Sequence, residues 1–334
     1  MNSLSLGDLA NSFMLQNRSS ALKTEITRLT QELTSGQVSD VQSVLGGNYS
    51  YLTDIEASLS SLEGYKVANS EASVFAETMQ AALENIQDTT SSLGTSMILV
   101  ADGGLDDVVL QTGQEAFELL ENTMNTLNTQ IAGRSLFSGA ATDQPALHSA
   151  KDLMNQLSTV VAGADGASAK LTAIQDWFDD PLGFDHVIYS GSNSGISPFN
   201  LAPTETLTLD VKATDPQLKD TIRSLAVAAI SGDESVVIDA DERSTLLHAA
   251  GEEVLRNQNG LTSLRAKVGY AEARIDSFVS RNATESVSLE YAKGTLLAAD
   301  PFETATRLEE VQFQLQSLYT LTAKNSQLSL VNFL

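Results

Sequence analysis

One stretch of the sequence has the spacing of a catalytic nucleophile. Gly191-Ser-Asn-Ser-Gly195 resembles the G-x-S-x-G turn, in which a sharp strand-to-helix turn exposes a reactive serine. The central position here is Asn193, whose amide is not a nucleophile. The small residues on either side favour a tight turn instead. The sequence therefore predicts no catalytic residue in this stretch.

Metal and cofactor sites are poorly supported as well. His148, His186 and His248 are far apart in sequence, and none belongs to an HxxxH or HExxH pattern, which brings two ligands to one helix face. Asp239-Ala-Asp241-Glu242 offers carboxylates, but no twelve-residue loop with a closing glutamate follows, so a solvated acidic turn is expected. Glycine-rich nucleotide motifs do not occur, and zero cysteines exclude disulfides and thiolate chemistry. We expect no metal, no cofactor and no enzymatic activity.

The charge of the chain argues against several classes of partner. Its 334 residues include 43 acidic and 19 basic side chains, which gives a formal net charge of −24 at pH 7. Nucleic acid and anionic lipid repel such a chain, so neither is an expected partner. No apolar run approaches the roughly eighteen residues of a membrane span, so no membrane insertion is expected. The first residues lack the basic segment of a signal peptide, so export would use another route.

Both ends of the chain carry apolar residues at helical spacing. The apolar positions step by four, three and four near the N-terminus, and by three, four and three near the C-terminus. Gly36 is the predicted end of the first helix, and Asp300-Pro301 the predicted start of the second. Because two thin stripes can bury each other only where the ends meet, we expect an antiparallel pair. The predicted assembly residues are Leu22, Ile26, Leu29, Leu33, Leu308, Val311, Leu315, Leu318, Leu328, Leu330, Phe333 and Leu334.

Long helices are predicted next to both end segments. A helical pattern runs from Tyr49 to Val100 and is broken at Gly103-Gly104, after a polar stretch at 37–48 that is expected to be a loop. The pattern slips by one residue after Leu62, which indicates a kink or a change of packing partner. A second helix follows, and Gly133 is expected to end it.

The returning arm has a single heptad register from Leu247 to Ala299. Its core positions are apolar except for Asn257, Asn282 and Glu285, which would either fix the register or lie where the bundle opens to solvent. The arm matches the length of the first long helix, as side-by-side packing requires. None of the six prolines lies in 1–144 or 217–300, so both arms are free to be helical.

The stretch at 139–243 differs in composition and holds five of the six prolines and Trp177. Residues 205–213 alternate apolar and polar side chains, which predicts a half-buried strand. Asp215-Pro216 predicts the start of a helix that Gly232 ends. The fold class is therefore expected to be mainly α, with long antiparallel helical coiled-coil arms from both chain ends and a small inserted α+β outer domain.

Three segments resemble a known family, the bacterial flagellins and flagellar hook-associated proteins. Residues 29–36, LTQELTSG, are similar to the family's "rLssG" turn, and residues 329–334, SLVNFL, to the closing "lSLldyL" of its hook–filament junction members. Residues 127–139 resemble the junction-type "GrYLFsG" turn, with Ser135 in place of tyrosine; the matching residues are Gly133, Arg134, Leu136, Phe137 and Gly139. The flagellin segment that usually follows the first turn is missing. The resemblance covers roughly residues 1–139 and 245–334.

This resemblance implies a structural subunit of the bacterial flagellum, at the junction between hook and filament. It implies an N-terminal inner-tube helix (1–45), two arms of a helical rod (46–138 and 246–300), an inserted variable outer domain (139–245) and a C-terminal inner-tube helix (301–334). The implied partners are other copies of the chain in a ring, an adjoining hook-associated protein, flagellin and an export chaperone. The implied location is extracellular, after export by the flagellar type III system.

Two alternative functions remain open for the same residues. A flagellin would form the filament itself, and its copy number per flagellum would be far higher. An adhesin or binding protein on a helical stalk would use the inserted domain, and that domain alone would then bind a ligand.

Overall fold

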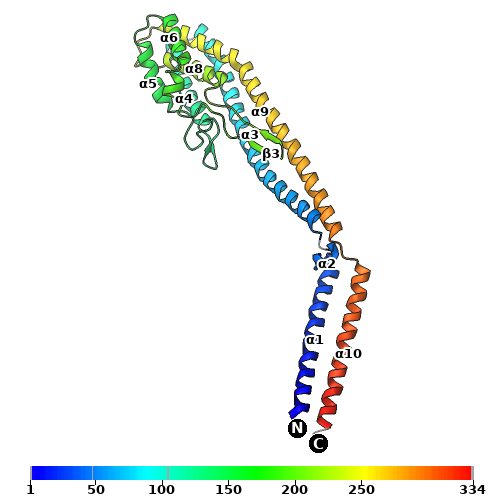
Figure 1. Ribbon diagram of the computed structural model, residues 1–334. Helices are drawn as coiled ribbons and strands as arrows, with labels where there is room; N and C mark the ends of the chain where they lie inside the picture. The colour runs from blue at the N-terminus through cyan, green and yellow to red at the C-terminus, as the bar shows by residue number, and fades with distance from the viewer. Residues whose placement is uncertain (1, 47, 104, 332–334) are drawn as a thin grey trace. The chain divides into compact units, whose positions relative to one another are not determined.

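The structure is a computed structural model that describes residues 2–46, 48–103 and 105–331, with side chains for 10–42, 45–46, 48–103 and 105–324 (Figure 1). The chain divides into two compact units. Unit 1 comprises residues 1–62 and 283–334, and unit 2 comprises residues 63–282. Each unit is described by itself below.

Unit 1 contains two long helices from the two ends of the chain, α1 (Asn2–Ser35) and α10 (Pro301–Val331). They lie side by side with both chain ends at the same end of the pair, so the predicted antiparallel pairing is confirmed (Figure 1). The chain leaves α1 at Gly36, whose φ of +70° is the left-handed conformation that glycine adopts after a helix. At the start of α10, Oδ1 of Asp300 accepts hydrogen bonds from the backbone N–H of Phe302 (2.8 Å) and Glu303 (3.1 Å).

Backbone hydrogen bonds join the segment after α1 to the segment before α10. The N–H of Val38 donates to the carbonyl of Leu297, and the N–H of Ala299 donates to the carbonyl of Gly36, each at 2.9 Å. These bonds fix the register of the two connections in unit 1. The predicted loop at 37–48 is partly wrong, because residues Val41–Leu45 form a short helix, α2.

Two longer helices, α3 (Ser50–Gly103) and α9 (Ala240–Leu296), each contribute to both units. In unit 2 they run antiparallel: Gln87 of α3 hydrogen-bonds Thr262 (2.8 Å) and Arg265 (2.9 Å) of α9. The predicted end of α3 at Gly103 is confirmed, and α9 ends at Leu296, three residues before the predicted position. The slip in the apolar pattern after Leu62 does not interrupt α3. It coincides with the division between the units.

The next helix, α4 (Asp106–Leu127), ends six residues before the predicted Gly133. At the end of α4, the side chain of Asn128 hydrogen-bonds the backbone of Leu147. Its Nδ2 donates to the carbonyl (2.9 Å), and its Oδ1 accepts from the N–H (2.8 Å). A two-stranded hairpin follows, β1 (Gln130–Ile131) and β2 (Arg134–Ser135). Ala132 and Gly133 form its turn with φ of +50° and +77°, as a two-residue type I′ turn requires.

The inserted stretch is mainly helical, with α5 (Ala150–Val161), α6 (Ala167–Asp179), α7 (Phe184–Val187), α8 (Pro216–Ser231) and a hairpin of β3 (Phe199–Ala202) and β4 (Glu205–Leu207). The predicted start and end of α8 are confirmed, and the helix packs against α4, α5 and α6. The predicted strand at 205–213 is wrong beyond Leu207, because its partner strand is only four residues long. The alternation correctly predicts which side chains are buried: Leu209, Val211 and Ala213 are all buried.

Two of the three polar residues in the heptad pattern hold the insert against α9. Nδ2 of Asn257 donates to the carbonyl of Gln217 (2.6 Å) and to Oγ1 of Thr221 (2.8 Å), both on α8. Nδ2 of Asn282, in a buried position, donates to the carbonyl of Leu201 on β3 at 2.8 Å. These asparagines therefore anchor the insert, a role that the heptad pattern alone does not indicate. The third, Glu285, is exposed.

No helix among the described residues is both long and apolar enough to cross a membrane.

Candidate assembly surfaces

The helix pair of unit 1 buries only some of its apolar side chains. Leu22 and Leu29 of α1 are 7% and 1% exposed, whereas Leu33 is 40% exposed. The remaining predicted positions with described side chains, Ile26, Leu308, Val311, Leu315 and Leu318, are half-buried. The side chains of Leu328 and Leu330, and Phe333 and Leu334 altogether, lie outside the described residues. The pair thus uses part of its apolar stripe internally and leaves the rest accessible.

A second apolar set lies on the same two helices, outside the predicted stripe. On α10, Phe302 is 83% exposed and Phe313 is 70% exposed, and their separation of eleven residues, about three turns, places them on the same side of the helix. On α1, Phe13 and Met14 are about two-thirds exposed. The list of predicted assembly residues did not include these four. A helix with two apolar sides needs two packing partners, and α1 supplies only one for α10.

Polar contacts give the helix pair of unit 1 a defined register. The ammonium of Lys23 on α1 lies 5.9 Å from the ring centre of Tyr319 on α10. Hydrogen bonds from Ser19 and Lys23 lower the pKa of the Tyr319 hydroxyl below its usual value. Tyr319 therefore links one position of α10 to one position of α1, which limits sliding of the two helices.

The turn at 133–139 is a docking point for the insert in unit 2. Leu136 and Phe137 are buried, and Gly139 has a φ of +62°. A Cβ atom at Gly139 would overlap the carbonyl oxygens of Ser192 and Ser194, so only glycine allows this approach. Backbone hydrogen bonds hold the residues on both sides of Gly139. The N–H of Ala140 donates to the carbonyl of Ser194 (2.9 Å), and the N–H of Ser192 donates to the carbonyl of Ser138 (2.8 Å). The stretch tested above as a nucleophile turn is thus a structural loop, as expected.

A tyrosine holds the same loop from its other side. The hydroxyl of Tyr189 donates to the carbonyl of Ser192 at 2.9 Å. Burial first, and then the nearby carboxylates of Asp215, Asp210 and Asp185, raise the pKa of Tyr189 to about 12. The phenol therefore stays protonated at neutral pH and remains a hydrogen-bond donor to the loop.

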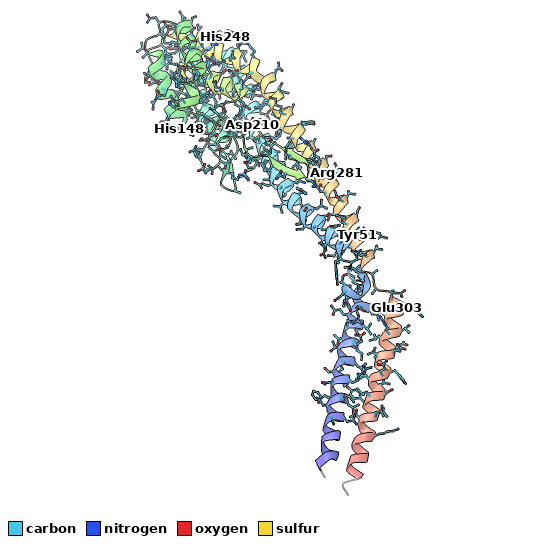
Figure 2. All side chains as sticks on the ribbon, viewed as in Figure 1. Tyr51, His148, Asp210, His248, Arg281 and Glu303 are labelled. Atoms are coloured by element: carbon cyan, nitrogen blue, oxygen red, sulfur yellow. The ribbon has the colours of Figure 1, made fainter. Side chains whose placement is uncertain are left out.

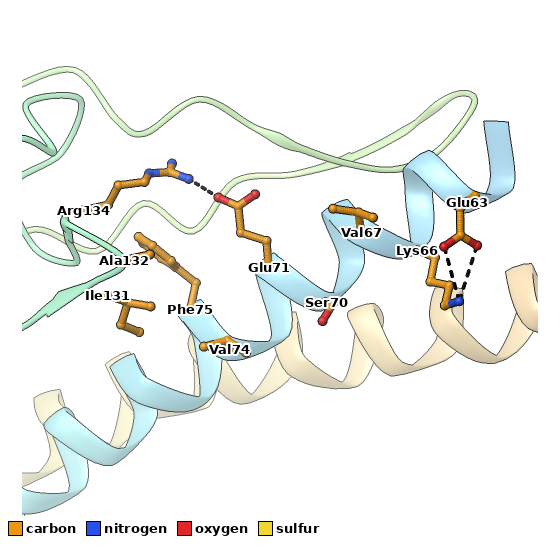
Figure 3. A pocket seen from close by; sticks show the side chains of 10 residues that line it. All are labelled: Glu63, Lys66, Val67, Ser70, Glu71, Val74, Phe75, Ile131, Ala132 and Arg134. Carbon is orange, nitrogen blue, oxygen red and sulfur yellow. Dashed lines mark hydrogen bonds and ion pairs between the residues drawn. The ribbon is translucent and has the colours of Figure 1, made fainter. Parts of the chain in front are cut away.

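Arg134 and the turn before it form one wall of an open groove in unit 2 (Figure 3). The guanidinium of Arg134 is ion-paired with Glu71 of α3 and lies 5.2 Å from the ring centre of Phe75. Ala132 also lines this groove and is the one described residue other than glycine with a clearly positive φ. We call this cavity of about 460 Å³ between α3 and the β1–β2 turn the hairpin groove.

The residues considered above for metal chemistry do not form a site. His148 and His248 lie on separate parts of unit 2 (Figure 2), and Nε2 of His248 is 3.4 Å from a carboxylate oxygen of Asp102. Oδ1 of Asp239 accepts the backbone N–H of Glu242 at 2.8 Å, so this acidic stretch caps the start of α9. Within the described residues, no group of three or more histidine or carboxylate side chains is placed to hold a metal ion.

Comparisons with known proteins agree with this architecture. Residues 253–334, which include most of α9 and all of α10, match the family model of the bacterial flagellin C-terminal helical region. A solved structure described as a putative flagellar hook-associated protein from Vibrio parahaemolyticus has a similar fold, with a TM-score of 0.51 and 14% identity. The similarity covers 73% of this chain and 95% of that one. No curated protein matches the chain significantly in sequence.

The family-model match confirms the resemblance to flagellins for residues 253–334, and the structural similarity agrees with the predicted mainly α fold with a small β-containing insert. Flagellins and hook-associated proteins are structural, non-enzymatic families, in agreement with the expectation of no enzymatic activity.

Proposed function

We propose that this chain, whose residues 253–334 match the bacterial flagellin C-terminal helical region, is a structural subunit at the junction between flagellar hook and filament. The observation that carries the proposal is the incomplete burial of the helix pair in unit 1. Aromatic side chains of α10 such as Phe302 and Phe313 remain exposed although α1 covers the other side of the helix. Assembly with other copies through α1 and α10 would cover them.

The energetics of apolar burial favour other copies of the chain as the molecules that cover these surfaces. A pair of helices buries only a narrow strip of apolar side chains, so most of its stability depends on packing against something else. Stacked copies of one chain provide that packing repeatedly, because each added copy covers the apolar surface of its neighbour. At roughly 25 cal/mol per Å² of apolar surface, burying one aromatic side chain contributes about 2–3 kcal/mol for each copy in the ring.

The junction is favoured over the filament by sequence features of the resemblance. The turn from Gly133 to Gly139 is similar to the junction type, and the segment that follows the first turn in flagellins is absent. The structurally similar protein is itself described as a putative flagellar hook-associated protein. A filament-forming flagellin is the second candidate, because the matched C-terminal region belongs to that family.

The role implies several partners and a location. The chain would contact other copies of itself in a ring, a hook-associated protein on one side and flagellin on the other. Before assembly, an export chaperone would cover the terminal helices, and the flagellar type III system would carry the chain to the extracellular side. The insert at 139–245 would face away from the tube axis.

A charge substitution in the assembly stripe tests the proposal. In the variant Leu315→Asp/Leu318→Asp, each assembled copy would bury two unpaired carboxylates, at a cost of several kcal/mol for each carboxylate. We expect cells that carry only this variant to build hooks but shed flagellin into the medium. The matched variant Gln312→Asp/Gln314→Asp adds the same charges at exposed positions between the two apolar sides of α10 and should assemble normally. Normal filaments and motility with the leucine variant would contradict the proposed role of α10.

A further inference from the structure

A single backbone carbonyl of the β3–β4 hairpin accepts hydrogen bonds from both α3 and α9. Nδ2 of Asn282 on α9 donates to the carbonyl oxygen of Leu201 at 2.8 Å, and Nδ2 of Asn69 on α3 donates to the same oxygen at 3.4 Å. Leu201 belongs to β3, which lies beside the two long helices (Figure 1). The hairpin therefore joins α3 to α9 within unit 2 through one atom.

A bulge in the hairpin presents this carbonyl to the helices. The strand register shifts between Asn200 and Ala202, so Leu201 is the extra residue of the bulge. A residue that is left out of the strand pairing keeps its backbone groups available for other partners, and a bulge often re-aims a strand in this way. The side chain of Leu201 is 0% exposed, so the bulge also fixes this residue against the core of unit 2.

Both asparagines interrupt the apolar seams of the helix pair. On α3, Asn69 is 0% exposed and lies seven residues after Leu62 and three before Ala72, which are also buried. On α9, Asn282 is buried and lies seven residues after Ile275, at the same heptad position. An apolar side chain in such a seam packs without an acceptor, and a polar one lowers stability. The acceptor that both amides use comes from the hairpin and not from either helix.

The hairpin is held to the helices by a small number of contacts. Phe199 and Leu207 are each 6% exposed, and the ring centre of Phe199 is 5.8 Å from that of Phe75 on α3. On the outer side, Glu205 of β4 pairs with Arg274 of α9 at 2.7 Å, and these side chains are 40% and 33% exposed. Strands of four and three residues form a hairpin that is marginally stable by itself.

The bond from Asn69 is the weaker of the two. Its length of 3.4 Å exceeds the usual range for such a hydrogen bond. Among the described residues, Oδ1 of Asn69 is buried and has no hydrogen-bond partner. Asn69 therefore gains little from the attached hairpin and loses its acceptor altogether when the hairpin leaves. Small elements with few contacts open before the whole molecule unfolds.

We propose that the β3–β4 hairpin is a detachable strap on which the pairing of α3 and α9 depends at the end of unit 2 that contains Asn282, its last residue. While the strap is attached, the Leu201 carbonyl satisfies one amide of each helix. When it detaches, both amides remain in an apolar seam without this acceptor, which disfavours pairing of the segments 63–75 and 272–282. These segments then open together with the hairpin, and the rest of unit 2 stays folded. The strap concerns unit 2 alone and does not rest on the proposed function.

Hydrogen exchange of the purified full-length chain, followed peptide by peptide, tests this dependence. In the strap variant, residues 199–207 are replaced by an equally long run of alternating glycine and serine. In the seam variant, Asn69→Leu and Asn282→Leu remove the two amides. We expect the strap variant to exchange about tenfold faster than the native chain in segments 63–75 and 272–282, because buried amides without an acceptor weaken the pairing by roughly this factor.

The strap replacement made in the seam variant distinguishes the two roles of the asparagines. The replacement removes the packing of Phe199 on Phe75 in both backgrounds, so the backgrounds differ only in the two amides. A strap that acts through the amides predicts a rise of less than about threefold in the seam variant. If the asparagines only set the register of the helices, exchange rises by the same factor in both backgrounds, and the proposal is overturned.

A milder pair of variants decides the question if the strap variant does not fold, which loss of protection in α8 would reveal. Glu205→Gln removes the ion pair with Arg274 and should raise exchange in the same two segments by roughly two- to fivefold. The matched variant Glu84→Gln removes another ion pair between α3 and α9, with Arg265 at 3.1 Å, and should leave those segments unchanged. Unchanged exchange in Glu205→Gln, or an equal rise in both variants, would contradict the strap.

Discussion

The two glycines of the turn at 133–139 give the sharpest prediction about stability, because they share a backbone conformation and differ in their surroundings. Gly133 and Gly139 both have positive φ, +77° and +62°. A Cβ atom at Gly133 would meet no atom within 4 Å, whereas one at Gly139 would overlap the carbonyl oxygens of Ser192 and Ser194. The two alanine substitutions therefore separate the cost of conformation from the cost of contact.

The magnitudes follow from these surroundings. Gly133→Ala costs about 1–2 kcal/mol for the left-handed conformation, and the reduced freedom of the unfolded chain offsets about 0.4–1 kcal/mol of this. Gly139→Ala has the same two contributions and forces the loop at 192–194 to move, at about 1–3 kcal/mol for overpacking. It also weakens two backbone hydrogen bonds of about 1 kcal/mol each. We expect Gly133→Ala to destabilise by less than about 1.5 kcal/mol and Gly139→Ala by about 3–5 kcal/mol.

Thermal unfolding of the full chain is the assay. For a unit of the size of unit 2, each kcal/mol lowers the melting temperature by about 2–4 °C, so the two variants should differ by roughly 6–12 °C. Asparagine, which tolerates positive φ, should be harmless at Gly133 and still costly at Gly139. Equal destabilisation by the two alanine variants would refute the claim that close backbone contact, and not conformation alone, requires glycine at Gly139.

Further substitutions and conditions test other parts of the account. Gly113→Ala should destabilise, because its Cβ would overlap backbone beyond the end of α8, whereas Gly269→Ala, in open space within α9, should stabilise by about 0.5–1 kcal/mol in urea unfolding. Lys170 and Glu242 form a mostly buried ion pair at 3.2 Å. Lys170→Ala leaves the Glu242 carboxylate unpaired and should lower the free energy of unfolding by about 3–5 kcal/mol, whereas the apolar double variant Lys170→Met/Glu242→Leu should recover most of this loss. Burial raises the pKa of the Asp215 carboxyl above its value of about 3.9 in the unfolded chain. The protonated carboxyl therefore stabilises the fold fully below about pH 3.9, and this stabilisation is lost as the pH rises through the pKa of the folded state. Asp215→Asn should therefore gain stability relative to the native chain between about pH 4 and neutrality, in unfolding curves measured across that range. EDTA should leave the melting temperature unchanged; a drop of many degrees would reveal a metal site that the geometry does not show.

Helix ends were predictable from the sequence wherever one residue decides them locally. Gly36 and Gly103 end helices, and proline after aspartate begins them at Pro216 and Pro301, as expected. Gly36 adopts a positive φ after its helix, and proline fixes the φ of a first turn, so these reasons lie in the residue's own backbone. Such signals act over a few residues, so they do not depend on the rest of the fold.

Features that depend on distant partners were not predictable. Gly133 was expected to end α4, but the helix ends earlier, because the side chain of Asn128 hydrogen-bonds the backbone of Leu147. No local pattern in the sequence connects these two residues. The alternation at 205–213 correctly indicated which side chains are buried. It did not indicate a strand beyond Leu207, because alternation reports burial and not the presence of a partner strand.

The candidate assembly surfaces were predictable to a similar, partial extent. The stripe through Leu22 and Leu29 follows from helical spacing, and the helix pair that buries it is confirmed. The exposed Phe302 and Phe313 lie on another side of α10, and only the position of α1 identifies that side as uncovered. The hairpin groove likewise combines α3 with a turn that is about sixty residues away in sequence, so it exists only in the folded chain.

Immunogold labelling of intact flagella, with an antibody against the insert at 139–245, distinguishes a junction subunit from a filament subunit. The insert suits this purpose because it is expected to face outward from the assembled tube. A structural subunit of the junction predicts a single narrow band of gold at the boundary between hook and filament. Label along the whole filament would assign the chain to the filament instead, and flagella without any label would contradict the account.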